Sequence, residues 1–247
     1  MTRRLAPWAA VAVAVAAATA LRVSLIHAGP DFEYDAFRHA YIARRLLTEW
    51  RDLRHHWVWL PLWHALGVAG YLLGGGHGAL RWLSVVASGA APFALAGYLR
   101  RACRDVDPWV PAAAGVCLAL WPAEVTIGAS GEPEALFQLL VLGVLWAWSA
   151  GRFAAAAAGL SLAALLRYEA WALLPVFGAL WLVEGRRRRA LWVLALPCAF
   201  VALWLAAQWR QHGDPLWFVA ENRRYVLSAW RENQLGDAVE RVAHPYT

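Results

Sequence analysis

Hydrophobic residues along this chain gather in long runs that are separated by short polar breaks. Several runs reach the roughly 20 residues that an α-helix needs to cross the hydrocarbon core of a bilayer. Prolines inside the runs, at positions 61, 92, 122, 175 and 197, are tolerated in membrane helices as kinks. The pattern therefore predicts an all-α polytopic membrane protein. The runs cover residues 5–27, 57–75, 79–99, 108–127, 134–150, 153–166, 170–184 and 190–209.

Residues 36–52 follow a helical period without forming a long apolar run. One stripe is mostly apolar and the opposite side is charged, which is typical of a helix lying along a membrane surface. The stripe holds His39, Ile42, Ala43, Leu46, Leu47 and Trp50, and the charged side holds Arg38, Arg45, Glu49 and Asp52.

The run 57–75 decides the topology. If it lies in the external face without crossing, seven spans remain, with the N-terminus inside and ten loop arginines in the cytoplasm. Only Arg167 then occupies a short external loop. If the run crosses and the N-terminus is outside, eight spans satisfy the charge rule nearly as well. Charge leaves both topologies open, but only the first puts the acidic loops around Asp35 and Glu132 on one face.

Composition agrees with lipid as the main solvent, because 61% of the residues are hydrophobic, 16% are charged and the mean hydropathy is +0.42. Many of the 17 tryptophans lie at run ends, as in interfacial aromatic belts. The net charge of +6 comes from arginines in the loops and does not indicate nucleic acid.

Two further features of the chain have ordinary structural explanations. The first run is predicted to be an uncleaved span, because Ile26 is not the small residue that signal cleavage after Ala28 requires. The cysteines Cys103, Cys117 and Cys198 form no CxxC pair, so we interpret them as small apolar fillers without a disulfide or metal site.

Acidic residues cluster in two polar breaks. The segment PDFEYDAF holds Asp31, Glu33 and Asp35, and Asp35 directly precedes the predicted surface helix. An N-cap role explains Asp35, yet a rigid, ionised carboxylate also suits a general base. The segment GASGEPE holds Glu132 and Glu134. An acidic residue at a helix start is stabilised by the helix dipole, which explains the presence of one carboxylate more readily than of two.

Three more sets of polar residues are candidates. Arg167 and Glu169 lie where one run ends and the next begins, and Arg167 breaks the charge bias, so a functional role is slightly favoured over a snorkelling pair. His64 is a candidate for substrate binding. Metal binding by the histidines is disfavoured, because the adjacent His55 and His56 point apart on any helix or strand. Arg223 and Arg224 in ENRRY suit phosphate contact or a solvated charge run equally.

The order of these motifs resembles the GT-C class of membrane glycosyltransferases, such as protein O-mannosyltransferases and aminoarabinose-transferase-like enzymes. The similarity covers about residues 1–210. It consists of an acidic residue before a surface helix, followed by a series of short motifs. In order, these are DAFRHAYIARRL, WLPLW, GYLRR, WPAE, GEPEALF and RYEAW.

The resemblance implies a module of about seven spans over residues 1–210, with an external loop at 28–78 and an external polar tail at 211–247. It implies that Asp35 matches the catalytic acidic position and that Glu132 and Glu134 match the second acidic loop. It also implies a polyprenyl-phosphate sugar donor, with a hexose such as mannose, and an acceptor protein, lipid or glycan at the external face of a bacterial inner membrane.

The chain departs from this family in two respects. Members of the family are usually longer than this chain. The chain is therefore interpreted as a fragment, a minimal enzyme or one half of a pair. The first motif reads DA where many relatives carry two adjacent acids, so a divalent cation is an option and no cofactor is assigned. A non-catalytic protein, or one that transports lipid or solute, is the alternative to the transferase.

Overall fold

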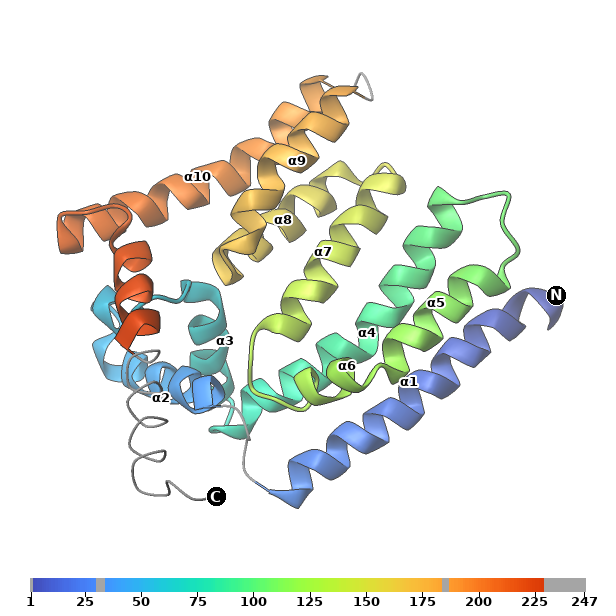
Figure 1. Cartoon of the computed structure of the whole chain (residues 1–247), viewed down its shortest axis with the longest axis horizontal. Coiled ribbons are helices and arrows are strands. Elements are labelled where there is room, and N and C mark those ends of the chain that lie inside the picture. Colours follow the sequence, from blue (N-terminus) through green and yellow to red (C-terminus); the bar gives the residue numbers. More distant parts are fainter. Residues whose placement is uncertain (1, 30–33, 184–186, 229–247) are drawn as a thin grey trace, which may run out of the picture.

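The structure is a computed structural model, which describes residues 2–29, 34–183 and 187–228. Every regular element in these ranges is a helix, which confirms the predicted all-α class. Figure 1 shows the helices in chain order. They are α1 (Thr2–Ala28), α2 (Tyr34–Glu49), the 3-10 helix η1 (Leu53–His56), α3 (Pro61–Leu72), α4 (Gly78–Ala102), α5 (Trp109–Leu120), α6 (Pro122–Ile127), α7 (Glu134–Ser149), α8 (Phe153–Leu166), α9 (Glu169–Val183), α10 (Arg187–His212) and a final helical stretch at 217–228.

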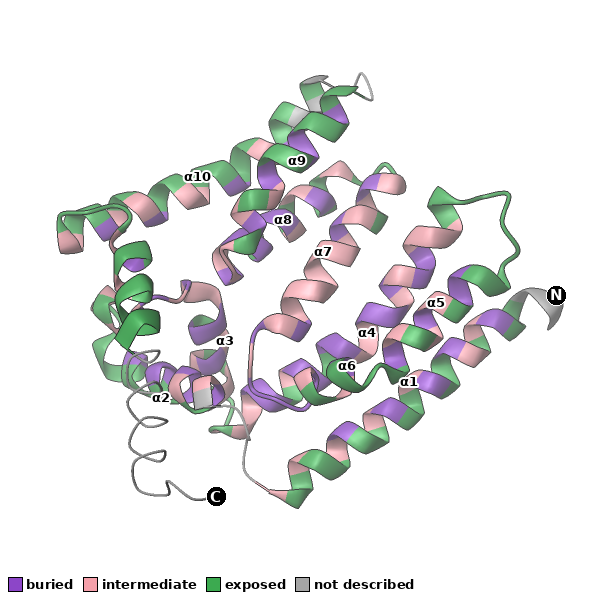
Figure 2. Cartoon of the chain, viewed as in Figure 1, coloured by how far each residue is buried: buried purple, intermediate pink, exposed green. Residues whose placement is uncertain are grey.

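Three helices among the described residues are long and apolar enough to cross a membrane. Their apolar segments are Leu5–Ala28, Gly78–Ala102 and Leu191–His212, with mean hydropathies of 2.1, 1.4 and 1.9. α4 is the most central of the three, because half of its apolar window is buried, against 22% in α1 and in α10. Figure 2 shows the same contrast between α4 and the exposed α10.

Hydrogen bonds between distant segments define two ends of the helix array. At one end, Nε of Arg101 at the end of α4 donates to the carbonyl of Ser149 at the end of α7, over 2.8 Å. At the other end, Nε1 of Trp63 in α3 donates to the carbonyl of Gly131, and Nε2 of Gln211 in α10 donates to Asp52. α3, the loop before α7 and the end of α10 therefore lie at the same end of the array.

Only part of the apolar run 57–75 is α-helical. α3 has 12 residues, or about 18 Å at 1.5 Å per residue, well below the roughly 30 Å hydrocarbon core. It packs against α2, and the chain returns from it to the same end of the array, since Arg81 in α4 donates to the carbonyl of Gly29.

Two of the five prolines begin helices and do not kink them, contrary to the sequence-based expectation. Pro61 is the first residue of α3. Pro122 starts α6, which divides the expected run 108–127 at Trp121, whose backbone is extended (φ −61°, ψ 126°). The reason is that proline disfavours helical geometry in the residue before it.

The amphipathic helix is confirmed, but its buried face is narrower than predicted. His39, Ile42 and Leu46 are buried in α2, whereas Leu47 and Trp50 at its C-terminal end are exposed. α2 begins at Tyr34, so Asp35 lies inside its first turn and is not its N-cap. A carboxylate in the first turn is still stabilised by the helix dipole.

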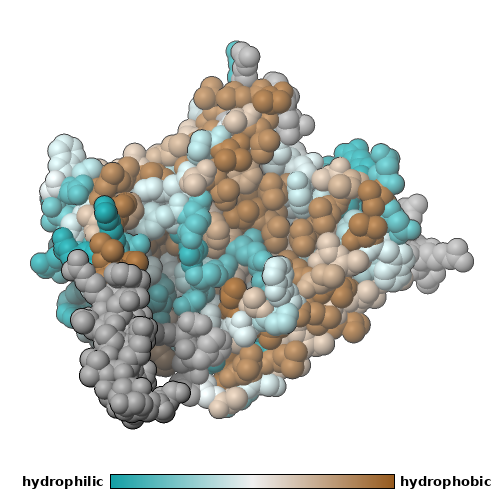
Figure 3. Space-filling model, viewed as in Figure 1, coloured by the Kyte–Doolittle hydropathy of each residue, from teal (hydrophilic) through white to brown (hydrophobic). Residues whose placement is uncertain are grey.

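The largest described hydrophobic cluster joins α7, α8, α9 and α10 away from the acidic loops. Trp148 and Trp181 stack with their ring centroids 3.8 Å apart, and Leu160 is fully buried beside them. The cysteines are all free and exposed, so they are not core fillers as predicted. Figure 3 shows hydrophobic residues along the flanks of the helices and hydrophilic residues gathered toward the two ends.

Candidate functional site

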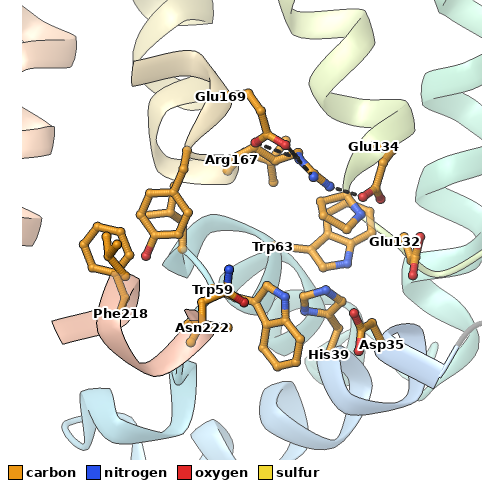
Figure 4. A pocket seen from close by; sticks show the side chains of 16 residues that line it. Asp35, His39, Trp59, Trp63, Glu132, Glu134, Arg167, Glu169, Phe218 and Asn222 are labelled. Carbon is orange, nitrogen blue, oxygen red and sulfur yellow. Dashed lines mark hydrogen bonds and ion pairs between the residues drawn. The ribbon is translucent and has the colours of Figure 1, made fainter. Parts of the chain in front are cut away.

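A cavity of about 570 Å³ lies where the acidic loops, the surface helix and the final helical stretch meet. Five of the ten polar residues singled out in the sequence as site candidates line it. Figure 4 shows lining side chains that converge from α2, α7, α9 and the stretch 217–228. The lining residues are Asp35, His39, Val58, Trp59, Leu60, Trp63, Glu132, Pro133, Glu134, Leu166, Arg167, Tyr168, Glu169, Phe218, Val219 and Asn222.

The first turn of α2 brings Asp35 to the cavity. Its side chain is partly exposed, and His39 lies one helical turn later, so both side chains share one face of the helix. Both line the cavity, and Figure 4 shows them next to each other. This places a carboxylate and an imidazole side by side at one wall of the cavity.

Arg167 occupies the opposite wall between two carboxylates. Its Nη1 donates to Glu134 in the first turn of α7. Its Nη2 lies 2.7 Å and its Nε 3.1 Å from the two carboxylate oxygens of Glu169, in the first turn of α9. Arg167 therefore forms the ion pair with Glu169 that the sequence suggested, and a second ion pair with Glu134.

The cavity carries an excess of negative charge. Asp35, Glu132, Glu134 and Glu169 contribute four carboxylates, and Arg167 contributes the guanidinium that faces them among the described lining residues. Glu169 holds the Nε–Nη2 edge of Arg167 and Glu134 accepts from Nη1, so an anionic ligand that binds the Nε–Nη2 edge has to replace Glu169.

α4 fixes the acidic loops in place. Arg81 is 9% exposed and joins the two loops, because its Nε donates to the carbonyl of Ala129 (3.0 Å) and its Nη1 to that of Gly29 (3.1 Å). Ser84, one turn further along, donates to the backbone carbonyl of Glu132 over 3.0 Å. These bonds hold the backbone before α7, from which Glu132 and Glu134 line the cavity.

Aromatic rings form the side of the cavity next to the final helical stretch. Tyr168 and Phe218 stack with their planes 5° apart and their centroids at 4.3 Å. Trp59 lies against His39, with 4.6 Å between the ring centroids. Flat aromatic faces beside carboxylates suit a ligand with both C–H faces and hydroxyl groups, which is the chemistry of a sugar.

A row of three buried histidines leads away from the cavity. Nδ1 of His39 lies 2.9 Å from Nε2 of His64, and Nδ1 of His64 lies 2.7 Å from Nδ1 of His56. Burial lowers the pKa of His39 to about 3, helped by the charge of Arg167, and lowers that of His56 to about 4, helped by His55. All three rings are therefore neutral at pH 7.

His55 and His56 point in different directions, as the sequence argument expected. His56 turns inward to His64, while Nε2 of His55 lies 2.5 Å from Glu49 at the surface. Among the described residues, Glu49, Asp52 and His55 form a convergent group with metal-ligand atoms. Arg45 pairs with Glu49 and Arg54 with Asp52, so these carboxylates already have cationic partners.

The remaining predicted residues lie outside the cavity or outside the described ranges. His64 is fully buried and reaches the cavity only through His39. Arg223 and Arg224 are exposed on the final helical stretch, where Arg224 pairs with Glu221 over 2.7 Å. They do not line the cavity, whereas their neighbour Asn222 does. Asp31 and Glu33 fall among the residues that are not described.

Comparison with known proteins adds no further identification. No family model matches the chain, and no curated protein or solved structure matches it either. Function is therefore inferred from the cavity, its charges and the helices around it.

Proposed function

We propose that this protein is a membrane glycosyltransferase, which moves a sugar from a polyprenyl-phosphate donor to an acceptor hydroxyl at the external membrane face. The main support is that one cavity combines a carboxylate base candidate, a guanidinium and aromatic faces. It lies at one end of apolar helices, where a lipid-linked substrate can reach it from the bilayer.

Asp35 is the proposed general base. The acceptor oxygen attacks the anomeric carbon of the sugar and forms the new glycosidic bond, while the bond from that carbon to the phosphate oxygen breaks. Polyprenyl phosphate leaves with the bonding electron pair, and Asp35 takes the proton of the acceptor hydroxyl. Asp35 is partly exposed in the first turn of α2 and lines the cavity, so an acceptor hydroxyl bound there can reach it.

Arg167 is the proposed phosphate ligand, although its partners in the structure are carboxylates. Glu169 holds its Nε and Nη2 edge, and the Glu169 side chain is 57% exposed, against 33% for Glu134. Glu169 is therefore the partner that leaves at lower cost. Once it moves away, the free edge of the guanidinium can bind two phosphate oxygens, a geometry in which charge developing on the leaving group is stabilised.

Glu132 and Glu134 are proposed to orient the sugar hydroxyl groups, while Trp59 and Tyr168 contact its apolar faces. This division follows the two sides of the cavity, with carboxylates near α7 and aromatic rings near the final helical stretch. A divalent cation held between these carboxylates is the alternative arrangement, and transfer with and without added cations distinguishes the two.

The proposed topology has seven crossings, made by α1, α4, the pair α5–α6, α7, α8, α9 and α10. The arginine-rich ends at 100–104 and 152 then lie in the cytoplasm, in agreement with the positive-inside rule. α2, η1 and α3 belong to an external loop, and the cavity opens on the external side.

The test is transfer of a labelled sugar from polyprenyl phosphate by the whole protein in proteoliposomes, with and without divalent cations. Asp35→Asn keeps the shape of the side chain but removes its basicity, so transfer should fall about 100-fold or more. Asp105→Asn is the matched control, because Asp105 is exposed in the polar turn at the opposite end of the array. It should transfer normally.

Two results would count against the proposal. A folded Asp35→Asn protein with near-normal transfer removes Asp35 from the mechanism and makes Glu132 the next candidate base. An unmodified protein that transfers no sugar from any polyprenyl-phosphate donor rejects the transferase and favours the non-catalytic or transporting alternative.

A further inference from the structure

We propose that His39, His64 and His56 form a proton relay, which carries the proton taken up at Asp35 away from the cavity. This inference rests on the proposed function, because the proton comes from the acceptor hydroxyl. The three residues come from α2, α3 and η1, so the relay is built by the fold of the external loop and not by one local motif.

The hydrogen-bonding pattern is that of a chain. His64 is fully buried and uses both ring nitrogens, Nε2 toward His39 and Nδ1 toward His56. Metal ligands instead direct one nitrogen from each ring to a common point, so this geometry favours proton transfer over metal binding. Within the described part of the chain, Nε2 of His39 and Nε2 of His56 make no further hydrogen bond and form the two ends.

A neutral imidazole has one donor and one acceptor nitrogen, and this rule allows two complete arrangements of the chain. In the first, His39 and His64 carry their protons on Nδ1 and His56 carries its proton on Nε2. In the second, His39 and His64 are protonated on Nε2 and His56 on Nδ1. Both arrangements satisfy the two ring–ring contacts, so passage of a proton converts one into the other.

Burial disfavours a positively charged imidazole at each position of the chain of histidines. The pKa of His64 is lowered well below its usual value by burial and by the two neighbouring histidines. Arg167 lowers the pKa of His39 and His55 lowers that of His56, so both neighbours disfavour a positive imidazole at the ends of the chain. A proton is therefore passed on and not stored on any of the three rings.

Each end of the chain has a suitable proton partner nearby. His39 lines the cavity one turn after Asp35, and Figure 4 shows the two side chains adjacent. At the other end, His56 is the last residue of η1, and the preceding residue, His55, contacts Glu49 and Asp52 at the surface. Surface carboxylates of this kind exchange protons with water.

The proton balance of one turnover is simple. Protonated Asp35 gives its proton to Nε2 of His39, whose Nδ1 proton moves to Nε2 of His64. The Nδ1 proton of His64 moves to Nδ1 of His56, and His56 releases its Nε2 proton to the surface. Asp35 is again a carboxylate. After the products leave, water in the open cavity takes the Nε2 proton of His39 and a proton from the surface enters at Nε2 of His56, which returns the three rings to the starting arrangement. The relay matters while the substrates fill the cavity and exclude water.

The geometry can be tested without any enzymatic assay. In the whole protein, uniformly labelled with ¹⁵N on histidine, a neutral His64 should show scalar couplings across both N–H···N hydrogen bonds. His64→Gln, made in the same background, should remove both couplings. A protonated His64, or the absence of couplings in the unmodified protein, overturns the relay.

The kinetic test uses transfer at saturating donor and acceptor. His64→Gln should lower kcat about 10-fold with little change in KM, and should abolish the part of the solvent deuterium isotope effect that involves more than one proton. His64→Gly should be restored by added imidazole, in proportion to the basicity of substituted imidazoles. His27→Gln is the matched control, because His27 is exposed at the end of α1 and should behave normally.

The outcomes separate the relay from the transferase itself. Transfer by the unmodified protein together with normal kcat and isotope effect in folded His64→Gln overturns the relay alone. No transfer by the unmodified protein overturns the proposed function and the relay with it. Loss of transfer in His64→Gly without imidazole rescue assigns His64 a structural role and also overturns the relay.

Discussion

Arg167 and Glu134 form an ion pair that joins the end of α8 to the start of α7 at the wall of the cavity. Because Glu169 holds the other edge of the same guanidinium, this arginine orders the starts of two helices at once. Its proposed role in phosphate binding therefore requires an exchange of partners, and the two glutamates can be distinguished by substitution.

Arg167→Lys should weaken donor binding by about 10-fold or more, because a lysine keeps the charge but loses the two parallel hydrogen bonds. Glu169→Gln should leave donor affinity unchanged or higher, since a competing carboxylate is removed. Titration of the polyprenyl-phosphate sugar into each variant in nanodiscs measures both effects. Unchanged affinity in Arg167→Lys would mean that Arg167 only pairs with its glutamates.

Acidic pH should destabilise the protein through its buried histidines. His39 and His56 have folded-state pKa values of about 3 and about 4, below the unfolded value of about 6.5. The unfolded state therefore binds more protons in this window, and the stability from the neutral rings is complete above about pH 6.5 and is lost as the pH falls. Between pH 7 and pH 5 we expect a loss of about 1–2 kcal/mol per histidine.

The measurement is thermal unfolding in detergent at both pH values. His56→Gln removes one titrating ring and should show a smaller decrease in unfolding temperature than the unmodified protein. His77→Gln is the control, because His77 is exposed in the turn before α4. An equal decrease in the unmodified protein and in His56→Gln would assign the acid sensitivity to other groups.

The seven-crossing topology predicts that Asp105 and Asp214 lie on opposite sides of the membrane. Both residues are exposed in polar turns, before α5 and after α10. In a background with Cys103, Cys117 and Cys198 replaced by alanine, Asp214→Cys should react with an impermeant maleimide in intact cells. Asp105→Cys should react only after lysis. Labelling of both sites in intact cells would reject the topology.

Trp63→Phe should loosen the second acidic loop. Trp63 is 1% exposed, and its Nε1 donates to the carbonyl of Gly131 over 2.8 Å. Loss of this bond should cost about 1 kcal/mol of unfolding free energy. Trp192→Phe is the control, since Trp192 is 79% exposed on α10. Thermal unfolding compares the two variants, and equal stability would show that the indole contact does not hold the loop.

Much of the helix pattern could be read from the sequence because apolar runs and polar breaks are local signals. The ends of α7 and α8 agree with the runs 134–150 and 153–166 to within a residue. The division at Trp121 was missed, because a proline inside an apolar run is compatible with either a kink or a new helix start. Local sequence does not decide between these outcomes.

The site was predicted less completely than the helices. Asp35, Glu132, Glu134, Arg167 and Glu169 stood out because charge next to a predicted span is costly, and all of them line the cavity. His39 was assigned to the apolar stripe of a surface helix, and Phe218 lay in a tail with no periodic signal. Their place in the cavity depends on how α2 and the stretch 217–228 pack in three dimensions.

The short helices near the cavity affect the surrounding lipid. α7, α8 and α9 have 16, 14 and 15 residues, which is about 21–24 Å of helix against roughly 30 Å of hydrocarbon. In the proposed topology this is a negative hydrophobic mismatch, relieved when the adjacent leaflets become thinner. Acyl chains beside these helices would be compressed, and lipid headgroups would be drawn toward the level of Arg167. A lipid-borne phosphate would then enter the cavity sideways, without leaving the plane of the membrane.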